Sequence, residues 1–151
     1  MAELISFDID GTLETGNGPG PITLDMVRQA KAAGYIIGSC SDRPVGDQRG
    51  MWERAGIEVE FTVIKHQLDS VREKFPDCSR YVHIGDTDLD RHFAGLSNFE
   101  FSAVQMMDPE PWMLSEDGEA HWGPLGRGYV DQLPPQPSRP NPSWGGSIDT
   151  P

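Results

Sequence analysis

Polar side chains stand directly after four short apolar runs of this sequence, and their types suit phosphoryl chemistry. Asp8 and Asp10 follow the first run, Ser41 the second and Lys65 the third, and the fourth leads into the acidic stretch GDTDLD (85–90). Carboxylates crowded this closely favour a hard cation, and a site with few protein ligands suits Mg²⁺. A hydroxyl and an ammonium beside them can bind and neutralise phosphoryl oxygens. The residue types therefore predict a site for phosphoryl chemistry.

These side chains can act together only if strands of one sheet bring them to the same edge. Apolar runs predict strands over 4–7, 35–39, 59–64, 81–84 and 99–104, the second with its polar end at Ser41. Apolar residues at helical spacing, with capping and stop residues around them, predict helices over 23–34, 44–56, 68–76 and 89–95. Strand and helix alternate throughout.

Such an alternation with short loops predicts right-handed crossovers and a parallel sheet that is covered on both faces. The expected fold is α/β, a three-layer, doubly wound, Rossmann-like arrangement with a mostly parallel sheet of about five strands. In sheets of this kind the ligand site lies outside the carboxyl ends of the strands. All the polar strand ends named above are expected to meet in that one crevice.

The character of the chain changes after the predicted core, residues 1–105. Nine of the 13 prolines lie beyond it. Residues 106–130 carry Trp112 and Trp122 and are interpreted as an irregular arm that packs on the core or on a partner, so a homo-oligomer formed through the arm stays open. Residues 131–151 are rich in Pro, Gly and Ser and are expected to form a flexible tail.

Composition excludes several classes of function. The 151 residues carry a formal net charge of −12, which disfavours non-specific nucleic-acid binding because that requires a basic face. No stretch approaches the ~18 apolar residues of a membrane span, and the N-terminus does not resemble a signal peptide. Cys40 and Cys78 show no metal-ligand spacing and are too few for a disulfide framework, so we expect a cytoplasmic protein without membrane contact.

The polar strand ends also resemble, in order, four motifs of the haloacid dehalogenase superfamily. DIDGTL (8–13) resembles its first motif, Asp-x-Asp-x-Thr/Val, and SCSDRP (39–44) is similar to its second, a Ser or Thr at a strand end. Lys65 stands where the third motif has its lysine, and GDTDLD (85–90) is similar to the fourth, Gly-Asp-x-x-x-Asp. The resemblance covers residues 4 to about 104.

The resemblance implies roles for the first two aspartates. Asp8 would be the nucleophile that attacks phosphorus and forms an aspartyl-phosphate, which water then hydrolyses. Asp10 would be the general acid that protonates the leaving oxygen and then the base for the attacking water. An acid at the second position favours a phosphatase or phosphotransferase over a dehalogenase. The predicted function is therefore that of a Mg²⁺-dependent phosphatase acting on a phosphomonoester of unknown class.

The same resemblance implies the ligands of the phosphate and of the cation. The phosphate of the substrate is expected to contact Asp8, Gly11, Ser41, Arg43 and Lys65. Mg²⁺ is expected to bind Asp8, the backbone carbonyl of Asp10, Asp86 and Asp90, the last directly or through water. Asp90 is also expected to orient Lys65.

Several simpler roles stay open for these residues. Ser41 could act as a cap before the helix at Pro44, and Ser39 competes with it as the strand-end hydroxyl. Lys65 and Arg43 could be ordinary surface residues. Asp88 is interpreted as a solvated residue at the start of a helix.

The intervals between the motifs are too short for the cap domain that usually selects substrates in this superfamily. Capless members typically act on extended substrates or borrow a neighbouring subunit, and the arm around Trp112 is one possible cover. Two other functions remain as alternatives. One is a phosphoacceptor signalling domain of the receiver type, although the order of the motifs disfavours it. The other is a catalytically silent binding module.

Overall fold

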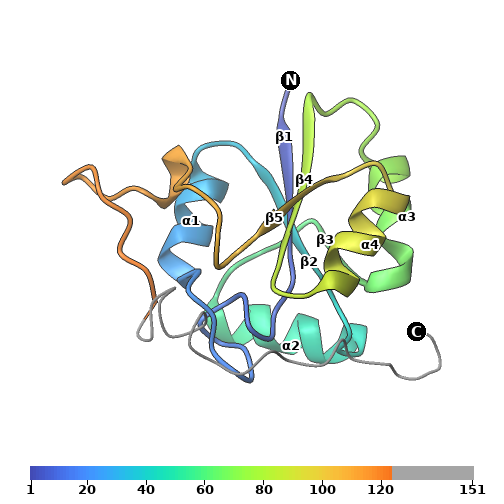
Figure 1. Ribbon diagram of the computed structural model, residues 1–151, viewed down its shortest axis with the longest axis horizontal. Coiled ribbons are helices and arrows are strands. Elements are labelled where there is room, and N and C mark those ends of the chain that lie inside the picture. Colours follow the sequence, from blue (N-terminus) through green and yellow to red (C-terminus); the bar gives the residue numbers. More distant parts are fainter. Residues whose placement is uncertain (124–151) are drawn as a thin grey trace.

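The computed structural model describes residues 1–123, which fold around a five-stranded sheet whose neighbouring strands are all parallel (Figure 1). The strands lie in the order β3-β2-β1-β4-β5. They are β1 (Glu3–Phe7), β2 (Ile36–Ser41), β3 (Phe61–Ile64), β4 (Arg80–Gly85) and β5 (Glu100–Ala103). The predicted α/β fold with a parallel sheet of five strands is confirmed.

Four α-helices connect the strands: α1 (Leu24–Ala32), α2 (Val45–Ala55), α3 (Leu68–Lys74) and α4 (Asp88–Leu96). The Thr23 hydroxyl accepts a hydrogen bond from the backbone N–H of Met26 and so caps α1 as its sequence suggests. Gly56 ends α2 in the left-handed conformation (φ 70°), which glycine adopts without strain. A 3₁₀ turn, η1 (Lys65–Gln67), precedes α3.

Several predicted boundaries differ from the structure by one or two residues. Pro44 is the residue before α2, not part of its first turn, and α4 continues past Gly95 to Leu96. The third strand begins at Phe61, two residues later than expected. The backbone N–H of Glu60 still donates to the carbonyl of Ile37 at 2.9 Å, but the N–H of Ile37 donates to the Glu60 carboxylate at 3.0 Å instead of to a backbone carbonyl.

Apolar residues on the two faces of the sheet form two separate clusters. Ile5 and Phe7 of β1 pack with residues of α1 and α2 in one cluster. Leu4 packs with residues of α3 and α4 in the other. Because successive strand residues point to opposite faces, the short strand β1 contributes side chains to both apolar clusters. The result is a three-layer arrangement with two helices on each face (Figure 1).

The described part of the C-terminal arm packs on the core next to α1 (Figure 1). Its 3₁₀ turn, η2 (Pro111–Met113), buries Trp112, whose indole meets the ring of Phe7 edge-on with centroids 5.8 Å apart. The Gln29 side-chain amide donates to the carbonyl of Trp112 at 2.6 Å. Further on, the backbone N–H of Gly123 donates to the carbonyl of Pro21. Residues 124–130 of the predicted arm and the predicted tail 131–151 lie outside the described residues.

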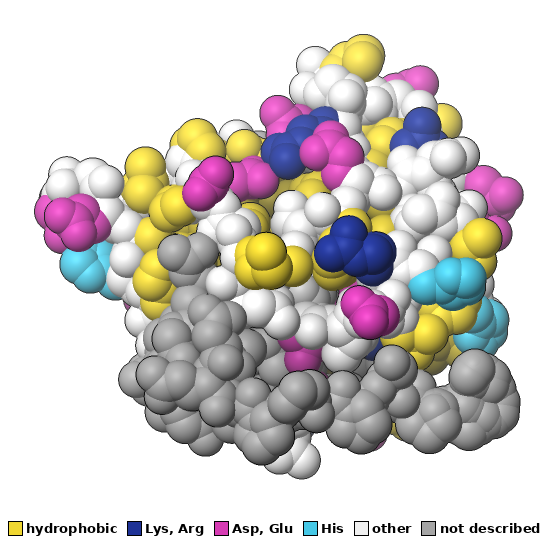
Figure 2. Space-filling model, viewed as in Figure 1, with side chains coloured by type: hydrophobic (Ala, Val, Ile, Leu, Met, Phe, Trp, Pro, Cys, Tyr) yellow, Lys and Arg dark blue, Asp and Glu magenta, His cyan; other side chains and the backbone are white. Residues whose placement is uncertain are grey.

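Acidic and basic side chains are interspersed on the face of the molecule drawn in Figure 2, without a continuous basic surface in its described part. Among residues 1–123, no helix combines the length and apolar character needed to cross a membrane.

Candidate active site

Asp8 follows the last residue of β1 and is buried at the carboxyl end of the sheet. Its backbone N–H donates to the carbonyl of Ile84 in β4, and its Oδ1 accepts the backbone N–H of Ile9 at 2.8 Å. Its Oδ2 accepts no hydrogen bond from residues 1–123, and the Nζ of Lys65 lies 3.7 Å away. A buried carboxylate oxygen without a hydrogen-bond donor is costly, so Oδ2 of Asp8 is a candidate for contact with a ligand.

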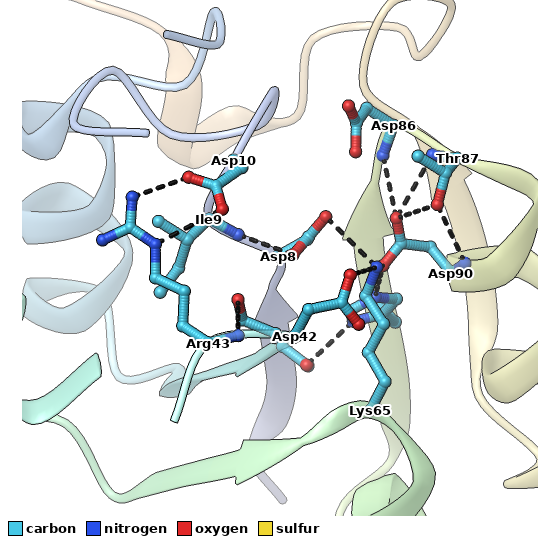
Figure 3. A network of polar contacts seen from close by, with 12 residues as sticks. Asp8, Ile9, Asp10, Asp42, Arg43, Lys65, Asp86, Thr87 and Asp90 are labelled. Atoms are coloured by element: carbon cyan, nitrogen blue, oxygen red, sulfur yellow. Dashed lines mark hydrogen bonds and ion pairs between the residues drawn. The ribbon is translucent and has the colours of Figure 1, made fainter. Parts of the chain in front are cut away.

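Lys65 projects its ammonium group into a set of three carboxylates (Figure 3). It is the first residue of η1, directly after β3, and its side chain is only 4% exposed. Besides Asp8, the Nζ atom lies 3.2 Å from Oδ1 of Asp90 and 3.6 Å from Oδ2 of Asp42. Asp42 is not among the residues that the sequence predicts for the site; its position beside Ser41 in SCSDRP was the available signal.

Asp90 is fully buried in the first turn of α4 and accepts hydrogen bonds at both of its oxygens. Oδ1 lies 2.8 Å from Nε2 of His83 and also faces Lys65. Oδ2 accepts the backbone N–H groups of Asp86 and Thr87 at 3.2 Å and the Thr87 hydroxyl at 2.9 Å. Thr87 and Asp90 form a reciprocal capping box, so the same carboxylate starts the helix and orients the lysine.

His83 of β4 extends this hydrogen-bonded network into the buried interior of the sheet. It is not among the site residues that the sequence predicts. Its Nδ1 lies 2.9 Å from the hydroxyl of Ser6, its partner in the β1–β4 register, and its Nε2 faces Asp90. Ser, His and Asp in a chain suggest nucleophilic hydrolysis, but Ser6 is fully buried and unreachable by a substrate. The signal in the sequence was a histidine two residues before the Gly85 of GDTDLD, on the same face of β4.

Asp10 has different partners from Asp8, although only Ile9 separates the two residues in the motif. Its carboxylate pairs with the Arg43 guanidinium, with Nη2 at 2.6 Å from Oδ1 and Nε at 3.3 Å from Oδ2. The backbone N–H of Asn17 also donates to Oδ1 at 2.8 Å. Asp10 therefore links the loop after β1, to which it belongs, with the loop after β2 (Figure 3). Arg43 is one of its partners and not an isolated surface residue.

Ser41 and Gly11 lie at the same edge of the sheet. Ser41 is buried, and its Oγ accepts the backbone N–H of Arg43 at 3.1 Å, so it closes the turn before α2. Gly11 has a positive φ of 76°, and a Cβ added there would lie 1.9 Å from Oδ2 of Asp86. Only glycine allows the loop after β1 to approach the acidic loop after β4 this closely.

Burial and neighbouring charges shift the pKa values of this cluster in different directions. Burial, reinforced by Asp90, raises the pKa of Asp8 well above its usual value, and Lys65 opposes the shift only in part. Burial also acts to raise the pKa of Asp90, but Lys65 and His83 outweigh it and the pKa of Asp90 falls below its usual range. Burial acts to lower the pKa of Lys65, yet Asp8 and Asp90 overcome it and the lysine stays charged.

Three of the predicted metal-ligating residues come together. Asp8, Asp86 and Asp90 each offer an oxygen, and these oxygens lie within 4.8 Å of one another. The all-oxygen donor set fits a hard divalent cation. The oxygens of Asp90 already accept several protein donors.

Comparisons of this chain with protein-family models, with curated proteins and with solved structures found no match. The resemblance to the haloacid dehalogenase superfamily therefore rests on the four motifs and their order.

Proposed function

We propose that this protein is a Mg²⁺-dependent phosphatase of the haloacid dehalogenase type, acting through an aspartyl-phosphate on Asp8. The observation that carries the proposal is the environment of Asp8, whose bare Oδ2 lies 3.7 Å from the buried ammonium of Lys65 and beside Asp86 and Asp90. A nucleophile, a cation site and a fixed positive charge are what phosphoryl transfer to a carboxylate requires.

Asp8 would act in its carboxylate form. The hydrogen bond from the backbone N–H of Ile9 to Oδ1 fixes the rotation of the carboxylate and leaves Oδ2 for attack on phosphorus. Burial opposes ionisation, while the ammonium of Lys65 favours it. The same ammonium would neutralise phosphoryl oxygens as the bond to Asp8 forms, and Asp90 keeps it in place.

Asp10 would serve as general acid and base on the opposite side of the phosphoryl group. It would give a proton to the leaving oxygen and later take one from the attacking water. The guanidinium of Arg43 donates to the carboxylate of Asp10 and so orients it. The Ser41 hydroxyl accepts the backbone N–H of Arg43 and positions that residue. Gly11, Ser41 and Arg43 would contact the phosphate of the substrate.

The carboxylates of Asp8 and Asp86 and the backbone carbonyl of Asp10 would hold the cation, with Asp90 behind them. Mg²⁺ bound there would screen the carboxylates from the negative phosphoryl group and orient it. Asp90 would act mainly through its neighbours, because its oxygens already accept hydrogen bonds from the backbone of the Asp86–Thr87 loop and from His83.

The intervals between the motifs support a capless enzyme. The loop after β1, α1 and β2 fill the chain between Asp10 and Ser41, and α2 and β3 fill the chain between Ser41 and Lys65. Neither interval contains a further folded unit. The carboxyl ends of the strands would therefore carry no inserted cap domain.

The receiver alternative finds less support in the topology. The strand order β3-β2-β1-β4-β5 is the order of the first five strands of the classic Rossmann sheet, whereas flavodoxin-like folds and receivers follow the order 2-1-3-4-5.

The proposal is tested by hydrolysis of phenyl phosphate with Mg²⁺, comparing the wild type with Asp8→Asn and Asp10→Asn. We expect steady turnover that either change reduces by at least about 10²-fold, the scale of lost acid–base or nucleophilic catalysis. Asp88→Asn is the matched control, because Asp88 is an exposed aspartate in the same motif. A stable phospho-aspartate without turnover would indicate signalling instead. Inactivity of the folded wild type on a broad panel of phosphomonoesters would refute the proposal.

A further inference from the structure

A small cavity lies next to the Asp10–Arg43 pair, between the loop after β1, the start of α1 and one side of α2. It has a volume of about 300 Å³ and is lined by Thr15, Leu24, Arg43, Met51, Arg54 and Ala55. This size matches the lower end of small-molecule sites. None of the roles described above uses Arg54 or the cavity itself.

Two arginines contribute to the lining of this cavity in a protein with a formal net charge of −12. Arg43 lines the cavity, and two of the five N–H donors of its guanidinium are directed at Asp10. Arg54 lies one turn after Gly50 on α2, and a Cβ at Gly50 would be 3.2 Å from its Nη1. A third guanidinium, that of Arg28, donates to the carbonyl of Ala55 and pairs with Asp25.

The rest of the lining is mainly apolar. Leu24, Met51 and Ala55 contribute carbon surface, and the hydroxyl of Thr15 is directed at the Met51 sulfur at 3.0 Å. Arginines favour oxyanions, which they can bind through two parallel N–H groups, while the apolar wall favours a hydrocarbon body. The chemistry of the cavity therefore matches a small molecule with an oxyanion attached to an apolar or aromatic body.

The position of the cavity relates it to the leaving group. In Figure 3 the guanidinium of Arg43 lies on the side of Asp10 that faces away from Asp8. In a displacement at phosphorus the nucleophile and the leaving oxygen are in line on opposite sides, and the acid that protonates the leaving oxygen stands next to it. A leaving group beside Asp10 would thus extend towards Arg43 and the cavity.

We propose that this cavity, the Arg54 pocket, receives the leaving group of the substrate, and that the preferred substrates carry a second oxyanion there, bound by Arg54 and Arg43. The inference rests on the proposed phosphatase function, because it assigns the pocket to the part of the substrate beyond the scissile oxygen. It names the substrate class as small phosphomonoesters with a second anionic group.

The test measures binding rather than turnover. Titration calorimetry with Mg²⁺ present compares 4-(phosphonomethyl)benzoate with 4-(phosphonomethyl)benzamide, a pair that cannot be hydrolysed and differs only in the second oxyanion. We expect the benzoate to bind the wild type about tenfold more tightly, the scale of one charge-assisted hydrogen-bonded contact. Arg54→Gln should remove most of this preference. Arg49→Gln is the matched control, because Arg49 is on the same helix but lines a different cavity.

Each outcome of the titrations either supports or overturns the proposed pocket. A preference that Arg54→Gln removes and Arg49→Gln keeps supports the pocket. Equal affinities in the wild type, a preference that survives Arg54→Gln, or no binding of either compound overturns it. The wild-type comparison stands even if a variant fails to fold. Turnover of phenyl phosphate is a separate measurement, so a failed pocket and a failed phosphatase proposal can be told apart.

A second oxyanion can be a carboxylate or another phosphate. A third ligand, 1,4-bis(phosphonomethyl)benzene, separates the two. Tighter binding of the bisphosphonate than of the benzoate assigns the pocket to bisphosphorylated substrates, and the reverse order assigns it to phosphorylated acids.

Discussion

The ammonium of Lys65 and the carboxylate of Asp90 form a buried ion pair, with Nζ 3.2 Å from Oδ1 and side chains 4% and 0% exposed. Asp90 satisfies its other oxygen with donors of the Asp86–Thr87 loop, so the pair is part of a wider hydrogen-bonded network. Removing one partner of such a pair leaves the other charge buried, which costs more than the pair itself contributes.

Asp90→Asn should therefore lower the free energy of unfolding by about 3–5 kcal/mol. Urea denaturation at pH 7 measures the loss, and Asp88→Asn is the exposed control, with an expected change below about 0.5 kcal/mol. The pKa of Asp90 is lowered in the folded protein, so its contribution is complete above the unfolded value of about 4 and is lost as the pH falls further. The difference between wild type and variant should shrink below pH ~4. A difference that grows in acid would contradict this assignment.

Asp8→Asn should stabilise the protein when no divalent cation is present. The pKa of Asp8 is raised by burial, so its folded state favours the protonated form. That contribution is present at low pH and is lost as the pH rises through the raised folded value. At pH 7 the variant should gain on the order of 1 kcal/mol over the wild type in chelator, and the gain should vanish near pH 4.

The same variant should lose its response to Mg²⁺. Ligand binding to the native state raises the melting temperature of the wild type, and removal of one carboxylate ligand should largely abolish that rise. Thermal unfolding with and without Mg²⁺ measures both effects. An equal Mg²⁺-dependent shift in both proteins would place the cation elsewhere.

His83 should act as a positioning residue for Lys65 through Asp90. His83→Leu removes the donor 2.8 Å from Oδ1 of Asp90 and should lower kcat on phenyl phosphate by about 10–100-fold, as for other supporting residues behind a ligand, while KM changes little. His83→Gln retains an amide N–H and should recover part of the rate. Ser6→Ala changes only the hydrogen bond on the other side of His83, remote from Asp90, so it should lower kcat less than His83→Leu does. Equal losses of kcat in the Leu and Gln variants would indicate general disruption of the core.

Trp112 should contribute to stability and not to catalysis. Trp112→Ala removes a buried ring that packs edge-on against Phe7, and should cost about 3–5 kcal/mol in urea denaturation. Trp112→Phe retains the ring contact and loses the hydrogen bond from the indole N–H to Glu110, so about 1 kcal/mol is expected. Both variants should hydrolyse phenyl phosphate like the wild type at temperatures where they are folded. A selective loss of kcat in the folded Phe variant would link the arm to the site.

The alternation of strands and helices along the chain and the edge of the sheet where its polar residues gather were predictable from local sequence, whereas the order β3-β2-β1-β4-β5 was not. Side chains alternate along a strand, and polar residues such as Asp8 and Lys65 stand where apolar runs end, so the pattern alone places them at the carboxyl ends of parallel strands. Capping and stop residues such as Thr23 and Gly56 act within one helical turn, which is why their positions agree with the structure.

The partners of each site residue depended on the tertiary structure. Asp10 pairs with Arg43 across 33 positions of sequence, and His83 meets Ser6 across 77. These contacts follow from the register of neighbouring strands and from side-chain rotamers, neither of which a single sequence specifies. For the same reason the sequence did not show the role of Asp42 beside Lys65, nor whether the arm with Trp112 packs on the core or on a partner. The sequence determined the types of residue and the edge where they gather, and the packing of distant strands and loops decided which atoms meet.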